Sequence, residues 1–205
     1  MIAIIDYGVG NLRSVEKAFH FIGVEAQISS DKEFILNADG VVLPGVGAFA
    51  DAMESLRKAG MVEVVKEVIA REKPLLGICL GMQLLFEYSE EGGERVEGLG
   101  LFKGSIKLLP SELNLKVPHM GWNSIQYKRD CLLFNGLPEV PFVYFVHSYY
   151  LTAEDKEVVI ATTEYGMEFD VAIGNGKVYA TQFHPEKSGE IGLTILKNWV
   201  NNVNS

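Results

Sequence analysis

The sequence predicts an α/β protein with a mostly parallel central sheet, flanked by helices and extended by antiparallel strands. Two observations predict this fold. In the first half of the chain, short apolar runs bounded by glycine alternate with segments whose apolar residues recur at helical spacing. In the second half, strand-like segments follow one another with few helices between them, as is typical of antiparallel pairing.

The parallel part of the sheet is predicted from four apolar runs. They are IAIID at 2–6, VEAQI at 24–28, GVVLP at 40–44 and PLLGI at 74–78. Continuous apolar strands indicate a sheet that is covered on both faces. The covering helices are expected at 12–22 and 50–71, where apolar residues return every three or four positions.

The antiparallel extension is predicted from the segments 99–110, 142–151 and 157–166. A hairpin is expected over 170–183, turning around Gly174-Asn175-Gly176, and a closing helix over 190–202. The stretch 90–98 is a polar loop, and no internal repeat or low-complexity linker is evident. We therefore expect residues 1–205 to form one domain.

Composition narrows the classes of function. The chain carries 18 basic and 27 acidic side chains, a net charge of −9, which repels nucleic acid and anionic membranes. The longest nearly uncharged apolar stretch, 74–86, is shorter than the about 20 residues of a membrane span. Two cysteines provide neither a disulfide framework nor metal-ligand spacing. We expect a soluble cytoplasmic protein without metal or cofactor.

Cys79 occupies a position that suits a nucleophile. It stands where the predicted strand 74–78 ends and a helix expected over 80–88 begins, and reactive sites of open α/β sheets lie at that edge. Gly77 and Gly81 leave room around a sharp turn, so the pattern Gly-x-Cys-x-Gly resembles a nucleophile elbow. A buried cysteine is more often a small apolar side chain, and the functional interpretation needs a base elsewhere in the chain.

His184 is the strongest candidate for that base. It ends a predicted strand, and Pro185 turns the chain so that Glu186 follows two residues later. A carboxylate at that spacing can hold the imidazole in the tautomer that accepts a thiol proton. The other histidines are expected to be packed, surface or interface residues: His20, His119 and His147.

The segments GICLGMQLLFE (77–87) and QFHPEKSG (182–189) together resemble the triad, or class I, glutamine amidotransferases, and the likeness covers nearly the whole chain. The resemblance implies the class I glutamine amidotransferase fold. It also implies that Cys79 attacks the side-chain amide of glutamine, that His184 acts as base and then acid, and that Glu186 orients His184. The N–H of Leu80 is the expected first donor to the oxyanion.

Five segments resemble one branch of that family, the glutaminase subunits of imidazole glycerol phosphate synthase. They are DYGVGNLRSV (6–15), LPGVGAF (43–49), PHMGWNSI (118–125), YFVHSYY (144–150) and QFHPEKSGEIG (182–192). This likeness implies that four residues line a glutamine pocket: Gly47, Gln83, Ser148 and Tyr149. It also implies that the Val46 N–H is the second oxyanion donor.

The glycines around Val46 have two interpretations. On residue type alone, Gly45 and Gly47 permit a tight turn between a strand and a helix. The resemblance implies that this stretch exposes a carbonyl to the site until a partner subunit binds, and a peptide flip costs little free energy next to glycine. We therefore expect the isolated chain to hydrolyse almost no glutamine.

The resemblance also implies a partner. It is a cyclase subunit with a (β/α)₈ barrel, which forms a heterodimer with the glutaminase and uses the ammonia to make imidazole glycerol phosphate and aminoimidazole carboxamide ribotide. Trp122, Tyr144 and Lys187 are expected near that partner. On residue type alone, the two aromatic residues are core or edge-strand residues, and the lysine is a surface charge.

Three alternatives remain open at this point. One is the glutaminase subunit for pyridoxal phosphate synthesis, which also pairs with a barrel, although the PHMGWN and PGVGAF segments count against it. Another is a redox or peptidase-like protein of similar sheet topology that uses the elbow cysteine. The last is a binding module with a vestigial site, against which the intact Cys79, His184 and Glu186 argue.

Overall fold

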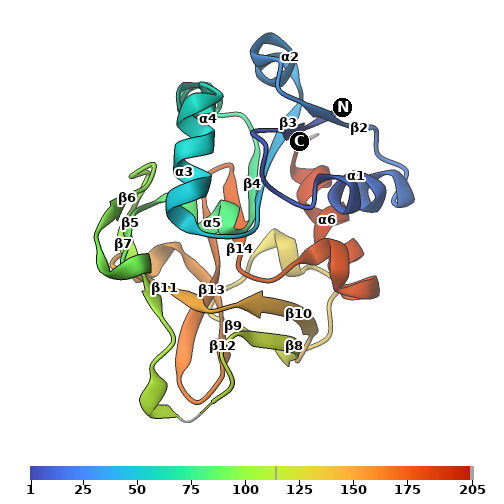
Figure 1. Ribbon diagram of the computed structural model, residues 1–205. Coiled ribbons are helices and arrows are strands. Elements are labelled where there is room, and N and C mark those ends of the chain that lie inside the picture. Colours follow the sequence, from blue (N-terminus) through green and yellow to red (C-terminus); the bar gives the residue numbers. More distant parts are fainter. Residues whose placement is uncertain (114, 204–205) are drawn as a thin grey trace.

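The computed structural model describes residues 1–113 and 115–203. A long mixed sheet runs through the molecule, with helices packed on both faces of its parallel part (Figure 1). Its five parallel strands, in spatial order, are β2 (Ala26–Ser29), β1 (Ile2–Ile5), β3 (Gly40–Gly45), β4 (Leu75–Cys79) and β14 (Val178–Thr181). The predicted parallel sheet is confirmed.

Alternation along the strands creates two apolar layers. On β1, Ile2 and Ile4 face one layer, which includes residues of α1 (Leu12–Phe21) and α6 (Gly189–Val203). Ala3 and Ile5 face the other layer, which is covered by α2 (Lys32–Asn37), α3 (Phe49–Lys58) and α4 (Met61–Ala70). All four strand residues are buried, so burial on both faces explains the unbroken apolar run.

The antiparallel extension continues from β14 through β13, β11, β7, β5 and β6, with β12 beside β13 and β9 beside β12. Among the described strands of this extension, only β5 and β7 pair in parallel. The bounds are β5 (Phe86–Ser89), β6 (Val96–Glu97), β7 (Phe102–Leu108), β9 (Gln126–Tyr127), β11 (Tyr149–Ala153), β12 (Val159–Glu164) and β13 (Glu168–Asn175).

A second, two-stranded sheet lies beside the extension (Figure 1). It pairs β8 (His119–Ser124) with β10 (Phe142–His147) in antiparallel register. We call these two strands the ribbon. The segment expected as one strand over 142–151 is therefore two strands, β10 and β11, which belong to different sheets and meet at Ser148.

Two helix predictions are wrong in extent. The segment 50–71 forms two helices because Gly60 adopts φ +65°, a left-handed conformation that interrupts the helical path between α3 and α4. The helix expected over 80–88 is the short α5 (Leu80–Leu84), after which the chain enters β5. A short apolar run that is buried all round does not distinguish helix from strand by its spacing.

Three further differences are local. The hairpin turn lies at Gly176 and Lys177, because β13 extends through Asn175. Helix α2 and strand β8 were not expected. The closing helix is confirmed as α6. Within the described residues, no helix is both long enough and apolar enough to cross a membrane.

Candidate active site

Cys79 sits in a sharp turn at the carboxyl end of β4, directly before α5. Its φ of +55° and ψ of −112° are rare for a residue other than glycine, so the backbone is strained there. A Cβ at Gly81 would lie 1.9 Å from the Leu43 carbonyl oxygen, which shows that α5 packs directly on the backbone of β3. The elbow predicted at this cysteine is present, and the residue is 7% exposed.

His184 and Glu186 form a fully buried pair. The imidazole Nδ1 donates to Glu186 Oε1 at 2.8 Å, and the two side chains are 2% and 1% exposed. The 3-10 turn Pro185–Lys187 brings the carboxylate back to the ring. Because Nδ1 is hydrogen-bonded to the carboxylate, Nε2 is the nitrogen that can exchange a proton with Cys79.

The surroundings of His184 favour its charged form. Burial lowers the pKa of the imidazole, but its interactions with Cys79 and Glu186 outweigh that effect and raise the pKa to about 9. Nε2 is buried and makes no hydrogen bond of normal geometry to any described residue. The balance favours an imidazolium beside Cys79 at neutral pH.

The ribbon holds the turn that carries His184. The His184 N–H donates to the Tyr144 carbonyl at 3.0 Å, and the Tyr144 N–H donates to Ser188 Oγ at 2.9 Å. Ser188 Oγ in turn donates to the His184 carbonyl at 2.6 Å. These three bonds connect strand β10 to the base of the candidate triad.

A cavity of about 290 Å³ opens beside Cys79 and His184. Every residue expected to bind glutamine or an oxyanion lines it: Val46, Gly47, Leu80, Gln83, Ser148 and Tyr149. Three more lining residues had no assigned role at this site in the sequence: Glu91, Val146 and His147. The loop after β3, helix α5 and the junction of β10 with β11 therefore converge on the nucleophile.

Tyr7 supports the loop after β3. Its hydroxyl donates to the Pro44 carbonyl at 2.8 Å, and the side chain is buried. Burial raises the pKa of Tyr7, and the nearby Cys79 raises it further, so the phenol stays protonated as a donor. Gly47, two residues past β3, has φ +94°, which glycine adopts without a side-chain clash.

A chain of buried imidazoles reaches the cavity from the ribbon. His147 Nδ1 lies 2.8 Å from the Tyr149 carbonyl, His119 Nδ1 lies 2.9 Å from His147 Nε2, and Asn123 Nδ2 lies 3.3 Å from His119 Nε2. A carbonyl only accepts, so His147 carries its proton on Nδ1, and His119 must do the same. Both histidines act as neutral, oriented rings.

Gln182 is a polar residue of the site that had no assigned role in the sequence. It is completely buried, and its Nε2 lies 3.7 Å from Cys79 Sγ. The available signal was its spacing from His184, because residues two apart near a strand end point to the same side.

The three residues expected near a partner lie away from the cavity lining, around the ribbon. Trp122 pairs with Tyr144 across the two strands, with ring centroids 6.2 Å apart, and Lys187 Nζ lies 6.0 Å from the Tyr144 ring. Trp122 is 56% exposed, so it is an edge-strand residue and not part of the core. Met120 and Phe142 are also exposed on the ribbon.

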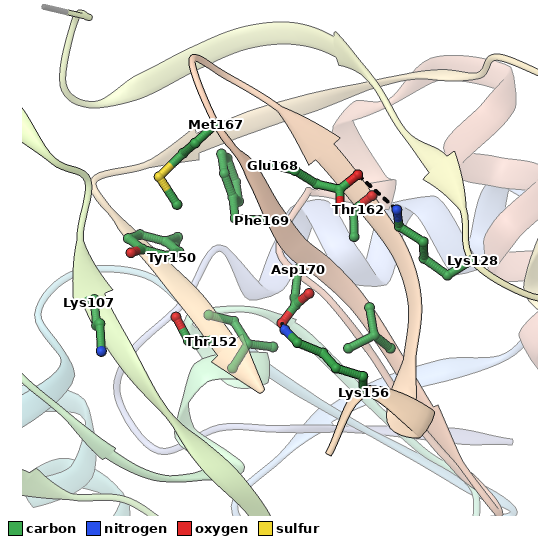
Figure 2. A pocket seen from close by; sticks show the side chains of 12 residues that line it. Lys107, Lys128, Tyr150, Thr152, Lys156, Thr162, Met167, Glu168, Phe169 and Asp170 are labelled. Atoms are coloured by element: carbon green, nitrogen blue, oxygen red, sulfur yellow. Dashed lines mark hydrogen bonds and ion pairs between the residues drawn. The ribbon is translucent and has the colours of Figure 1, made fainter. Parts of the chain in front are cut away.

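A larger hollow of about 610 Å³ lies over β11, β12 and β13 (Figure 2). Four of its five charged side chains form two ion pairs, Lys128 with Glu168 at 2.8 Å and Lys156 with Asp170 at 2.7 Å, and Lys107 is the fifth. No cysteine or histidine is among the described residues that line it. The smaller cavity beside Cys79 is therefore the candidate active site.

The family model and the related sequences that match this chain agree on one family. The family model described as glutamine amidotransferase class-I matches residues 3–203. The imidazole glycerol phosphate synthase subunit HisH of Moorella thermoacetica is 54% identical over 97% of this chain and 93% of its own length. The protein of the same name from Caldanaerobacter subterraneus is 54% identical over 97% of both chains.

Solved structures agree on the fold. A crystal structure described as a glutamine amidotransferase matches with a TM-score of 0.76 and 18% identity over all of both chains. The structure of PurLQS from Thermotoga maritima contains a chain that matches with a TM-score of 0.74 and 18% identity over 98% of both. At such low identity these structures bear on the fold alone.

Proposed function

The chain belongs to the class I glutamine amidotransferases, and on that premise we propose that it is the glutaminase subunit of an imidazole glycerol phosphate synthase in histidine biosynthesis. It hydrolyses glutamine to glutamate and ammonia with Cys79, His184 and Glu186. The observation that carries the proposal is the buried His184–Glu186 pair, 2.8 Å apart, whose imidazole lines the same cavity as the strained Cys79 elbow. Relatives more than 50% identical over nearly their full length support the choice of branch.

Glutamine is recognised in the cavity by groups of matching polarity. Both N–H groups of Gln83 Nε2 have acceptors within the protein, so its Oε1 is the atom that serves the substrate. Glu91 presents a carboxylate to the cavity for the α-ammonium group, and the Phe49 N–H holds that carboxylate at 2.6 Å. Gly47, Ser148 and Tyr149 complete the wall.

Acylation begins with the thiolate. Cys79 Sγ adds to the side-chain carbonyl carbon of glutamine, and the carbonyl oxygen becomes an oxyanion. The N–H groups of Leu80 and Val46 donate to that oxyanion, and removing one such donor typically costs about 3 kcal/mol of transition-state stabilisation. The His184 Nε2 proton passes to the amide nitrogen, the carbon–nitrogen bond breaks, and ammonia leaves a γ-glutamyl thioester.

Deacylation reverses the roles of the same groups. His184, now neutral, takes a proton from a water molecule that attacks the thioester carbon. The carbon–sulfur bond breaks, glutamate leaves, and the thiolate and imidazolium are restored. Glu186 stays ionised and holds Nδ1–H throughout.

Activity depends on the peptide between Gly45 and Gly47. In the silent state this stretch presents a carbonyl to the cavity, and engagement of the partner turns the Val46 N–H inward. Support for the proposal comes from Gly47, whose positive φ leaves the backbone free of side-chain restraint, and from Val46, which is 38% exposed at the cavity rim.

The partner is a cyclase subunit with a (β/α)₈ barrel, bound as a heterodimer against the ribbon face near Trp122, Tyr144 and Lys187. It uses the ammonia to form imidazole glycerol phosphate and aminoimidazole carboxamide ribotide. Exposed apolar side chains on the ribbon support this assignment, since such clusters mark interaction surfaces. The free thiol suits a reducing compartment such as the cytoplasm.

The test is glutamate release from glutamine by the purified chain alone, with the cyclase barrel, and with the barrel and its nucleotide ligand. We expect a large rise at the last step. Full activity of the isolated chain would contradict the peptide gate. Absence of glutamate in every mixture, with Cys79 still open to alkylation, would point to another synthase partner or to a protein that is not an amidotransferase.

A further inference from the structure

Gln182 lies between the nucleophile and the glutamine pocket. The residue follows β14, is 0% exposed, and makes two side-chain contacts with groups of the site. Its Nε2 is 3.7 Å from Cys79 Sγ, and its Oε1 accepts from Gln83 Nε2 at 2.8 Å. Gln83 Nε2 also donates to the Tyr149 carbonyl at 3.2 Å.

The polarity of this chain of contacts is fixed at its far end. The Tyr149 carbonyl can only accept, so the Gln83 group that faces it must be the N–H₂ group. The second hydrogen of that nitrogen requires an acceptor, which is Gln182 Oε1. The remaining end of the Gln182 amide, which faces Cys79, is therefore a donor and not an oxygen.

We propose that Gln182 is a further catalytic residue, whose side-chain amide donates a hydrogen bond to the Cys79 thiolate and holds it for attack on the substrate amide. The inference rests on the proposed glutaminase chemistry for its use, but not for its geometry. No proton is transferred and no covalent bond changes at Gln182. When the thioester forms, the sulfur loses its charge and the hydrogen bond weakens; when glutamate leaves, the bond regains its strength.

The same amide connects substrate binding to the sulfur. Gln83 and Tyr149 line the cavity. The Tyr149 carbonyl fixes the orientation of the Gln83 amide, and the Gln83 amide in turn orients Gln182. A change in the position of the Tyr149 carbonyl, at the start of β11, therefore reaches Cys79 through two side-chain amides. His184 acts on the sulfur as a proton carrier, whereas Gln182 acts on it as a fixed dipole.

The experiment measures alkylation of Cys79 by iodoacetamide across pH 5 to 10, in the full chain with and without its partner. Gln182→Met keeps the length of the side chain and removes the donor, and Gln182→Glu places a carboxyl group beside the sulfur. We expect alkylation at pH 7 to slow about tenfold in Gln182→Met, and more in Gln182→Glu, with the midpoint of the pH profile moved to higher pH. Cys131 is replaced by Ser in every protein, so that one thiol is observed.

Thr181→Val is the matched control, because Thr181 is equally buried at the end of β14, directly before Gln182, and its hydroxyl donates to the Phe183 carbonyl. It should leave the alkylation profile unchanged. A profile in both Gln182 variants that matches the unsubstituted chain would overturn the proposal, as would an equal shift in Thr181→Val. If neither Gln182 variant folds, Gln83→Met decides: loss of the orienting donor should slow alkylation, and an unchanged rate would also overturn the proposal.

Alkylation requires neither glutamine turnover nor the cyclase. A changed profile in a chain that releases no glutamate would therefore support the role of Gln182 while contradicting the proposed function. Glutamate release by a chain whose alkylation profile is unchanged by the Gln182 variants would support the proposed function while contradicting the role of Gln182.

Discussion

His119 Nδ1 and His147 Nε2 lie 2.9 Å apart at the buried end of the ribbon, where His147 reaches the cavity. Burial lowers the pKa of His119 to about 4. Burial also lowers the pKa of His147 to about 3, helped by repulsion from the neighbouring histidines and opposed by its hydrogen bond to Tyr149. Each ring is thus held neutral well below the pH at which a solvated histidine becomes charged.

This pair should make the fold sensitive to acid. Below a pH of about 6.5 the unfolded chain binds protons at both histidines, whereas the folded chain binds them only near pH 4 and below. Their contribution to stability is complete above pH 6.5 and is lost as the pH falls, by up to ~1.4 kcal/mol per pH unit for each ring. Urea unfolding at pH 7.5, 6 and 5 measures the slope.

The matched variant for that measurement is the double replacement of His119 and His147 by Gln. It should be less stable at pH 7.5 but lose less stability on going to pH 5, because the two titrating rings are absent. The carboxylates contribute equally in both proteins, so the difference between the two slopes reports on the histidines. An identical slope in the two proteins would show that the histidines do not titrate as described.

Glu186→Gln should reduce activity without removing it. The Gln oxygen can still accept from His184 Nδ1, but the negative charge that helps to raise the pKa of His184 to about 9 is gone. We expect kcat/KM for glutamine to fall about 10- to 100-fold in the complex with the partner, and His184→Ala to fall further. Equal losses in the two variants would contradict a purely orienting role for Glu186.

The raised pKa of His184 has its own signature in stability. A folded pKa above the unfolded value contributes stability that is complete below pH 6.5 and is lost as the pH rises through about 9. In Glu186→Gln that loss should end at a lower pH and be smaller in total, because the folded pKa of His184 is lower. Thermal melting between pH 6 and pH 9.5 compares the two proteins. A fall in melting temperature over this range that is larger in Glu186→Gln than in the unsubstituted chain would argue against the assignment.

Cys79→Ala should abolish glutamate release while the fold and partner binding remain intact. Alanine keeps the strained backbone at φ +55°, but glycine relieves it. We therefore expect Cys79→Gly to be more stable than Cys79→Ala by about 1 kcal/mol in urea unfolding, and equally inactive. Measurable turnover in either protein would remove Cys79 from the role of nucleophile.

Trp122→Ala should weaken partner binding without disturbing the fold. The side chain is 56% exposed on the ribbon, so the melting temperature should change little, whereas the affinity for the cyclase barrel should fall at least about tenfold. Phe21→Ala is the control, because Phe21 is 78% exposed on α1. Equal affinities for Trp122→Ala and the unsubstituted chain, by calorimetry, would exclude Trp122 from the interface.

The sequence predicts the parallel strands and the Cys79 elbow well, because both depend on local pattern. Four apolar runs flanked by glycine became β1, β2, β3 and β4, each within about two residues of its expected position. The turn at 184–186 was also local, since Pro185 fixes it. Each of these features is specified within a window of ten residues.

Other features depend on distant contacts and were missed. Helix α2 has one buried residue, Ile35, and hence no apolar period to detect. The division of 142–151 at Ser148 is decided by which strands are available to pair, not by propensity. Gln182 gains its significance only when the fold brings it to Cys79, which lies 103 positions earlier in the chain.

The ribbon pairs only within itself among the described strands, and it is tied to the rest of the molecule at a few points. One is the hydrogen bond from the His184 N–H to Tyr144, and another is the covalent passage through Ser148 to Tyr149. Strand β10 carries both attachments. A displacement of the outer face of the ribbon is therefore expected to shift both His184 and Tyr149. His184 and the cavity wall at Tyr149 are thereby mechanically coupled through one strand.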